Sequence, residues 1–229
     1  MSDEQPRKIS RREMLKSAGL AGAAVAFPGT LSGTTPEKTA LPVLGEGTAR
    51  GVRSADAPPR ALQTLTVAEF EILTAMVARI IPADELGPGA REAGAMYYID
   101  RELGGALSGQ KEAYQIGLAA LDRYSRYSRG RPFVELSETE QDSVLIDCQG
   151  GSATNTGAGF AGSSGQFFNM VRSHTLQGTF SDPYYGGNQD FIGWDLLRYP
   201  GVRTGVSAAD QARMEAQELP PNHRSAYER

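Results

Sequence analysis

The sequence predicts a mainly α-helical protein, a single compact helical domain that carries long glycine-rich and aromatic loops. Helix starts are indicated at Thr66, Ser137 and Ser207, where a hydroxyl residue precedes an acidic residue by three positions, as in a capping box. Apolar residues follow the first two starts at spacings of three and four, the period of a helix that packs on a core. No two alternating apolar runs are joined by a hairpin turn, so no sheet is predicted.

The first helix of the domain is predicted to open at Thr66, whose partner in the capping box is Glu69. Its apolar stripe consists of Val67, Phe70, Leu73, Met76, Val77 and Ile80. Pro82 ends this helix, since proline lacks an N–H and clashes with the preceding turn. A second helix is expected from about Ala90 to Leu103, closed by the glycine pair that follows.

The later helices follow from the same periodicity. A third is expected from about Gln110 to Tyr127, and a fourth from Ser137 through Cys148. Residues 150–165 contain six glycines and are expected to form a loop. A fifth helix is predicted from about Gln166 to Gln177, with Gly178 as its terminating residue. Short helices are expected over residues 192–197 and after Ser207.

Four regions are expected along the 229 residues. Residues 1–26 have the pattern of an export signal, and residues 27–60 form a flexible linker rich in Pro, Gly, Thr and Ala. Residues 61–203 make the helical domain, and residues 204–229 a polar C-terminal tail. The formal net charge of −4 argues against a nucleic-acid partner, because such proteins carry a basic face. A single Cys excludes an internal disulfide and a four-cysteine metal site.

The first 26 residues have the features of an export signal. The twin-arginine pattern S-R-R-x-F-L-K is matched by Ser10, Arg11, Arg12, Leu15 and Lys16, with a Met at the position of the Phe. The apolar run that follows is too short for a bilayer, which needs about 20 residues, and an Ala-Val-Ala cleavage site closes it. We therefore expect a periplasmic protein that is exported in the folded state. A chance Arg pair and an uncleaved anchor are the alternatives.

Candidate catalytic patterns each have a plainer structural interpretation. The run Gly162-Ser163-Ser164-Gly165 is one residue short of a G-x-S-x-G nucleophile elbow and follows no strand. His174 has no carboxylate at helical spacing, so a packed or surface His is expected. Cys148 is expected to be a small buried hydrophobe, with a link to another chain as the alternative.

Two further groups of three residues carry side-chain oxygens and are candidates for catalysis or metal binding. Residue types suited to the paired acids of sugar chemistry occur at Asp84, Asp100 and Glu102. Residue types suited to Ca²⁺ occur at Asp182, Asn188 and Asp190. Helix-end and surface carboxylates explain the first trio more simply, and Asx turns explain the second. We therefore assign no catalytic, cofactor-binding or metal-ligating residue to this chain.

Aromatic residues are concentrated late in the domain. They are Phe167, Phe168, Phe180, Tyr184, Tyr185, Phe191, Trp194 and Tyr199. Large aromatics on loops suit the core of a protein interface, where they bring area at low entropic cost. The alternative is that they seal the core of this domain. The residues expected at a partner interface are Phe167, Phe168, Tyr184, Tyr185, Trp194 and Tyr199.

Short motifs lie along the whole domain. They include Leu65-Thr66-x-x-Glu69, Ile80-Ile81-Pro82-Ala83-Asp84, Gly87-Pro88-Gly89-Ala90-Arg91-Glu92-Ala93-Gly94, Tyr98-Ile99-Asp100, Leu136-Ser137-x-x-Glu140-Gln141 and Phe167-Phe168. The most specific are Thr175-Leu176-Gln177-Gly178, Tyr185-Gly186-Gly187-Asn188, Gly193-Trp194 and Tyr199-Pro200-Gly201. As a set they resemble the small subunit, subunit 3, of bacterial membrane-bound gluconate 2-dehydrogenase and related FAD-dependent sugar and alcohol dehydrogenases. The chain departs from that family at Val202, where some members carry a Cys, and in the glycine-rich insert over residues 150–165.

The resemblance implies a non-catalytic small subunit that binds no cofactor itself. Its partner would be a glucose-methanol-choline-type flavoprotein that holds FAD, and a multihaem cytochrome c subunit with haem c often takes the electrons onward. The twin-arginine signal would then bring the folded flavoprotein through the export machinery, and the complex would associate with the inner membrane. The alternative is a stand-alone exported helical binding protein without a flavoprotein, and an independent periplasmic enzyme comes third.

Overall fold

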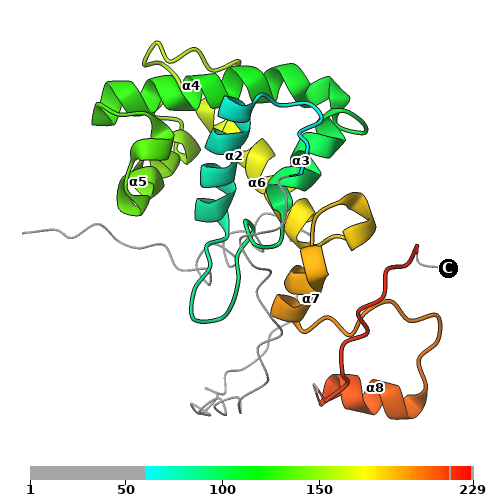
Figure 1. Cartoon of the computed structure of the whole chain (residues 1–229). Coiled ribbons are helices and arrows are strands. Elements are labelled where there is room, and N and C mark those ends of the chain that lie inside the picture. The colour runs from blue at the N-terminus through cyan, green and yellow to red at the C-terminus, as the bar shows by residue number, and fades with distance from the viewer. Residues whose placement is uncertain (1–59, 217, 228–229) are drawn as a thin grey trace, which may run out of the picture. The chain divides into compact units, whose positions relative to one another are not determined.

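The computed structural model describes residues 60–216 and 218–227 of the chain (Figure 1). The chain divides into two units, residues 1–61 and residues 62–229, and the second unit contains every helix discussed below. The predicted export signal, with Ser10, Arg11, Arg12, Leu15 and Lys16, and the predicted linker up to residue 59 lie outside the described residues.

Seven α-helices make up the described part of the chain. They are α2 (Val67–Ile80), α3 (Ala95–Leu103), α4 (Lys111–Arg129), α5 (Glu138–Gln149), α6 (Ser164–Phe180), α7 (Ile192–Leu197) and α8 (Ala208–Glu215). Four 3-10 turns accompany them: η1 (Ser108–Gln110), η2 (Phe133–Glu135), η3 (Pro183–Tyr185) and η4 (Gln189–Phe191). Within the described ranges there is no strand, only two isolated bridges. The predicted helical fold class is thereby confirmed.

Helix α6 is the centre of the packing (Figure 1). It packs against α3 and α5 most extensively and also touches α2, α4 and α7. The largest side chains that are fully buried between these helices include Tyr114, Phe133, Phe168, Leu73, Met76, Ile99, Leu103, Leu118 and Leu121. Burial of such side chains provides the main favourable term for folding. Four residues of the predicted α2 stripe, Leu73, Met76, Val77 and Ile80, lie in this core, but the expectation was wrong for Val67, which is 67% exposed at the start of the helix.

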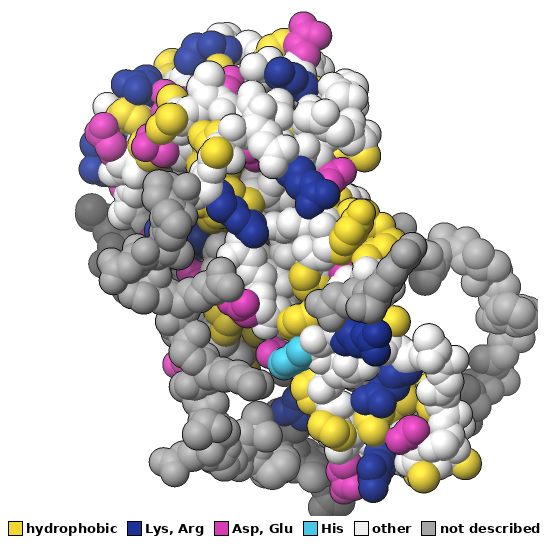
Figure 2. All heavy atoms as spheres, turned by 45° about the vertical axis from the view of Figure 1, so that its right-hand side comes forward, with side chains coloured by type: hydrophobic (Ala, Val, Ile, Leu, Met, Phe, Trp, Pro, Cys, Tyr) yellow, Lys and Arg dark blue, Asp and Glu magenta, His cyan; other side chains and the backbone are white. Residues whose placement is uncertain are grey.

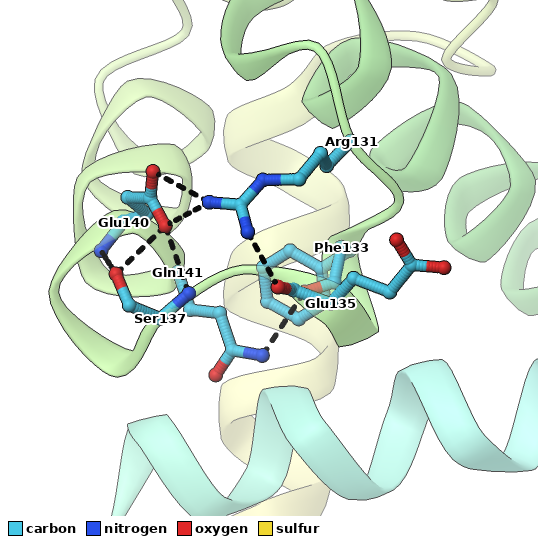
Figure 3. Close-up of polar contacts among 6 residues, drawn as sticks. All are labelled: Arg131, Phe133, Glu135, Ser137, Glu140 and Gln141. Carbon is cyan, nitrogen blue, oxygen red and sulfur yellow. Dashed lines mark hydrogen bonds and ion pairs between the residues drawn. The ribbon is translucent and has the colours of Figure 1, made fainter.

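Two capping boxes start α2 and α5 as the sequence predicts. In the second box, shown in Figure 3, Ser137 Oγ accepts the N–H of Glu140, and the Glu140 carboxylate accepts the N–H of Ser137 at 2.8 Å. Arg131 holds the same carboxylate with contacts of 2.9 and 3.0 Å. The Gln141 side chain donates to the Phe133 carbonyl at 3.0 Å. These bonds satisfy N–H groups that have no partner within the helix and fix η2 against the start of α5.

The second helix begins at Ala95, five positions later than the Ala90 expected from the sequence. The Ala90 N–H donates to the Ile81 carbonyl at 2.9 Å, so this stretch turns back toward the end of α2. Gly94 then has φ 74° and ψ 28°, a left-handed conformation that ends the turn and precedes the helix. Local composition favoured a helix here, and the left-handed backbone at Gly94 interrupts it.

Helix α6 runs from Ser164 through Gly178 to Phe180, so the expectation that Gly178 terminates it was wrong. A Cβ at residue 178 would approach the backbone of Ala95 and the ring of Tyr98 at about 3 Å. Gly178 therefore lets α3 pack closely on α6, which is a reason for glycine that differs from helix termination. The start also differs, because Ser163 forms a capping box with Gln166 and the helix begins at Ser164.

The remaining boundaries lie close to expectation. Helix α4 ends at Arg129, two residues later than predicted, and α7 and α8 form where short helices were expected. The glycine-rich stretch 150–163 contains turns and no helix, yet Ala153 and Ala158 in it are buried. Residues after 203 pack back on the helical domain at one point, since Asn222 pairs with Gly201 in an isolated bridge.

Candidate interaction surface

The residues that follow α6 form a compact aromatic segment, which we define as residues 182–199. It contains η3, η4 and α7 and is anchored through its backbone to α6 and to the turn that precedes α3. The Asn188 N–H donates to the Gly178 carbonyl at 2.7 Å, and the Gln189 N–H donates to the Ala93 carbonyl at 3.0 Å. A Cβ at Gly187 would collide with the same Gly178 carbonyl, so this close approach requires glycine.

The Asn188 side chain holds the segment together from inside. It is fully buried, donates to the Ser181 carbonyl at 2.8 Å and accepts the Gly193 N–H at 2.7 Å. Its backbone is left-handed, with φ 43°, a conformation that Asn tolerates better than most residues. Asn188 therefore has a structural role, but it forms no Asx turn as expected, because its side-chain oxygen accepts an N–H five residues further on.

Three of the six predicted interface aromatics are buried within this chain. Phe167, Phe168 and Trp194 are 6%, 2% and 5% exposed. Trp194 Nε1 donates to the Phe180 carbonyl at 3.0 Å, and its ring lies 4.9 Å from that of Tyr199, centroid to centroid. These three residues seal the domain's own packing, so they offer little surface to a partner.

The other three predicted aromatics reach the surface. Tyr184 is 55% and Tyr199 39% exposed, while Tyr185 is half-buried. Leu197, on α7, is also 55% exposed. Figure 2, which brings the side of α7 and α8 forward, shows hydrophobic side chains gathered in groups among charged ones. The surface of this segment is therefore apolar and aromatic at several points.

Tyr184 and Tyr185 meet a third tyrosine that the sequence did not single out. Tyr227 stacks on Tyr184 with ring centroids 4.3 Å apart, and its hydroxyl lies 2.7 Å from that of Tyr185. We call Tyr184, Tyr185 and Tyr227 the tyrosine cluster. Tyr227 is 42 positions away from Tyr185, in a tail expected to be polar, so no local pattern in the sequence could have identified it.

The acidic candidates are engaged in structural hydrogen bonds. Asp100 is 2% exposed, and its carboxylate accepts the N–H groups of Gln63, Thr64 and Leu65 at 2.7, 3.1 and 2.8 Å. Asp84 accepts the N–H of Leu86 at 2.9 Å, as in an Asx turn. Glu102 is within ion-pair distance of Arg101 at 3.9 Å. In the part of the chain that is described, no group of three or more His, Cys, Asp or Glu side chains is placed to hold a metal ion.

Asp182 caps η3 and also binds the C-terminal residues. Its carboxylate accepts the N–H of Tyr184 at 2.9 Å, the Oγ–H of Ser225 at 2.6 Å and the N–H of Ala226 at 2.8 Å. Burial alone would raise the pKa of Asp182, but these hydrogen bonds outweigh it and hold the pKa below its ordinary value. The expected Asx turn is present, and the bonds to residues 225 and 226 were not foreseen.

His174 is packed inside the domain. Its Nδ1 lies 2.8 Å from the Tyr114 hydroxyl, and the two rings stack at 5.8 Å. Burial lowers the pKa of His174 and raises that of Tyr114, so both side chains are neutral at neutral pH, and the tautomer of the imidazole sets which of them donates. The pair satisfies two buried polar groups and leaves no base facing solvent at this position.

The sequence model of the family described as gluconate 2-dehydrogenase subunit 3 matches residues 67–201, more than half of the chain. The chain belongs to the gluconate 2-dehydrogenase subunit 3 family. The match begins at the first residue of α2 and ends at Gly201, so it includes the aromatic segment and excludes Tyr227. No curated protein and no solved structure gives a significant match.

The one cysteine of this subunit 3 chain is buried. Cys148 on α5 is 0% exposed and forms no disulfide within the chain. Burial raises the pKa of its thiol to about 12, so the thiol stays protonated at neutral pH. Both findings agree with the expected role as a small hydrophobe. None of the described helices is long and apolar enough to cross a membrane.

Proposed function

We propose that this chain is the non-catalytic small subunit of a periplasmic, membrane-associated FAD-dependent sugar or alcohol dehydrogenase. In this proposal it binds a glucose-methanol-choline-type flavoprotein, supports its folding and carries it through the twin-arginine export route. FAD belongs to the flavoprotein, and haem c to a cytochrome c subunit where one is present. The observation that carries the proposal is the family membership over residues 67–201.

The environment of the candidate catalytic residues supports a non-catalytic role. Asp100 is buried and accepts three backbone N–H groups, His174 is paired with Tyr114, and the Cys148 thiol is buried and protonated. A general base or nucleophile needs access to substrate and a free lone pair. These side chains instead serve the fold.

We further propose that the flavoprotein docks on the exposed aromatic part of residues 182–199. Tyr184 and Tyr199 combine high exposure with positions fixed by their neighbours, since Tyr184 stacks on Tyr227 and Tyr199 packs on Trp194. Rigid aromatic side chains of this kind are frequent hot spots in interfaces, because they bury large area and lose little entropy.

The docking proposal is tested by substituting surface tyrosines in the co-expressed complex. Tyr184→Ala and Tyr199→Ala should each weaken flavoprotein binding by about 2 kcal/mol or more, about thirtyfold. Tyr127 on α4 is 77% exposed and lies outside the aromatic segment, so Tyr127→Ala is the matched control and should bind normally. Normal binding by both segment variants, at full helical content, would place the interface elsewhere.

The export role is tested separately at Arg11 and Arg12. Changing both to Lys keeps the charge but removes the paired guanidinium geometry that a receptor reads. Dehydrogenase activity should then disappear from the periplasmic and membrane fractions and remain in the cytoplasmic lysate, assayed with a soluble dye as acceptor. If the flavoprotein still reaches the periplasm with the Lys pair, or with this chain deleted, the carrier role fails.

A further inference from the structure

The aromatic segment contains an unusual concentration of left-handed backbone. Among the described residues, every non-glycine position with positive φ lies within it, namely Asn188 (43°), Asp190 (52°), Phe191 (62°) and Arg198 (52°). Residues with a Cβ atom rarely adopt this backbone conformation, and bulky residues such as Phe191 do so least readily. Residues held in this way persist only when surrounding contacts over-determine them.

Part of those contacts comes from the end of the chain, at the start of the aromatic segment. Ser225 Oγ and the Ala226 N–H donate to the Asp182 carboxylate at 2.6 and 2.8 Å. The next residue, Tyr227, stacks on Tyr184 and bonds the Tyr185 hydroxyl. Because Asp182 also caps η3 through the Tyr184 N–H, the C-terminal residues and the turn share one anchor.

The same short stretch also reaches the strained centre and the far end of the segment. The His223 ring stacks on Phe191 with centroids 5.1 Å apart and planes within 10°. His223 Nε2 lies 2.6 Å from Asp195 Oδ1 on α7. The Asn222 N–H donates at 3.0 Å to the carbonyl of Pro200, the residue directly after the segment. Residues 222–227 therefore contact the aromatic segment from its first turn to its last.

We propose that residues 222–227 form a C-terminal clamp that holds the aromatic segment in its strained conformation, and that release of the clamp lets the segment relax while the helical core stays folded. The clamp lies outside the matched residues 67–201, and the inference does not depend on a flavoprotein partner. Its physical basis is that a segment carrying backbone strain opens at lower free energy than the core once its extra contacts are removed.

The chain contains a built-in reporter for this test. Trp194 is the only tryptophan, is 5% exposed and packs against Phe191 and Tyr199. Its quenching by acrylamide therefore measures opening of the segment. Limited chymotrypsin digestion, with cleavage sites located by mass spectrometry, measures the same opening independently.

Three variants are compared with the full-length wild type. The first ends at Pro221, which removes the whole clamp. The second is Tyr227→Ala, which removes the stack on Tyr184 and the bond to Tyr185. The third is Tyr127→Ala, a control that truncates another exposed tyrosine, on α4.

We expect acrylamide quenching of Trp194 to increase in the shortened chain and, to a smaller extent, in Tyr227→Ala. Cleavage within residues 182–199 should become about tenfold faster in the shortened chain, equivalent to about 1.4 kcal/mol, because it follows the population of the open segment. Far-UV circular dichroism should keep the helical signal, and the control should match the wild type.

Three results would each overturn the clamp. Unchanged Trp194 quenching and cleavage in the shortened chain would mean that residues 222–227 do not hold the segment. Loss of the helical signal in the shortened chain would make these residues part of the core fold. An equal rise in Tyr127→Ala and Tyr227→Ala would show that the response is not specific to the clamp.

Discussion

Replacement of Asp100 distinguishes a structural carboxylate from a catalytic one. The side chain is 2% exposed and accepts N–H groups of Gln63, Thr64 and Leu65, the three residues that lead toward α2. A hydrogen bond to a charged group contributes about 1.5–3 kcal/mol, so three bonds give about 5–9 kcal/mol before compensation. Two of the three are only partly buried, and water can replace them. We therefore expect Asp100→Ala to lower the free energy of unfolding by about 3–5 kcal/mol.

Asp100→Asn should cost less, about 2–3 kcal/mol, because the amide oxygen retains part of the bonding while the NH₂ group faces N–H donors. Urea unfolding followed by far-UV circular dichroism gives both values, and the slope m should stay unchanged. Glu71→Gln makes the same acid-to-amide change at an exposed position on α2 and should stay within about 0.5 kcal/mol of the wild type. Asp100 variants as stable as this control would refute the anchoring role.

Three other side chains give predictions of the same kind. Trp194→Ala should lower the free energy of unfolding by about 3–5 kcal/mol, since it leaves a cavity and removes the donor to the Phe180 carbonyl; a denaturation midpoint equal to the wild type would contradict its burial. The Cys148 thiol, with its pKa raised to about 12, should react slowly with Ellman's reagent in the native chain and rapidly in denaturant, and prompt native reaction would contradict this. Burial lowers the pKa of His174, so the unfolded chain binds a proton first as pH falls through about 6.5, and stability should decrease below that pH. His174→Gln should flatten this pH dependence, and an unchanged profile would count against it.

Helix positions were predictable where the signal is local. The capping boxes at Thr66 and Ser137 and the apolar stripes that follow them lie within a few residues of sequence, and the structure forms α2 and α5 there. Glycine was harder to interpret. Glycine often ends a helix, and Gly178 was interpreted in this way. It lies inside α6 instead, where its missing side chain lets α3 pack closely. The residues of α3 that it contacts are far away in sequence.

The candidate surface was predictable in outline and not in detail. The concentration of aromatic residues predicts that this part of the chain forms either an interface or core packing. Residues 182–199 have no regular spacing of apolar side chains that would distinguish a buried ring from an exposed one. Trp194 is therefore inside and Tyr184 outside for tertiary reasons alone. Tyr227 was not singled out, and the role of Asp100 as an anchor for Gln63 to Leu65 was not foreseen, since the partners of these residues lie 42 and 35–37 positions away.

The proposal that this subunit 3 chain binds a flavoprotein is tested most directly by identifying what co-purifies with it from the periplasm. An affinity-tagged chain is expressed from its own locus and purified from the periplasmic extract, and FAD released on denaturation is quantified against the chain. We predict equimolar FAD, bound to a co-purified large subunit with dye-linked dehydrogenase activity. Recovery of the chain alone and free of flavin, from an extract in which that activity is present, would contradict the account.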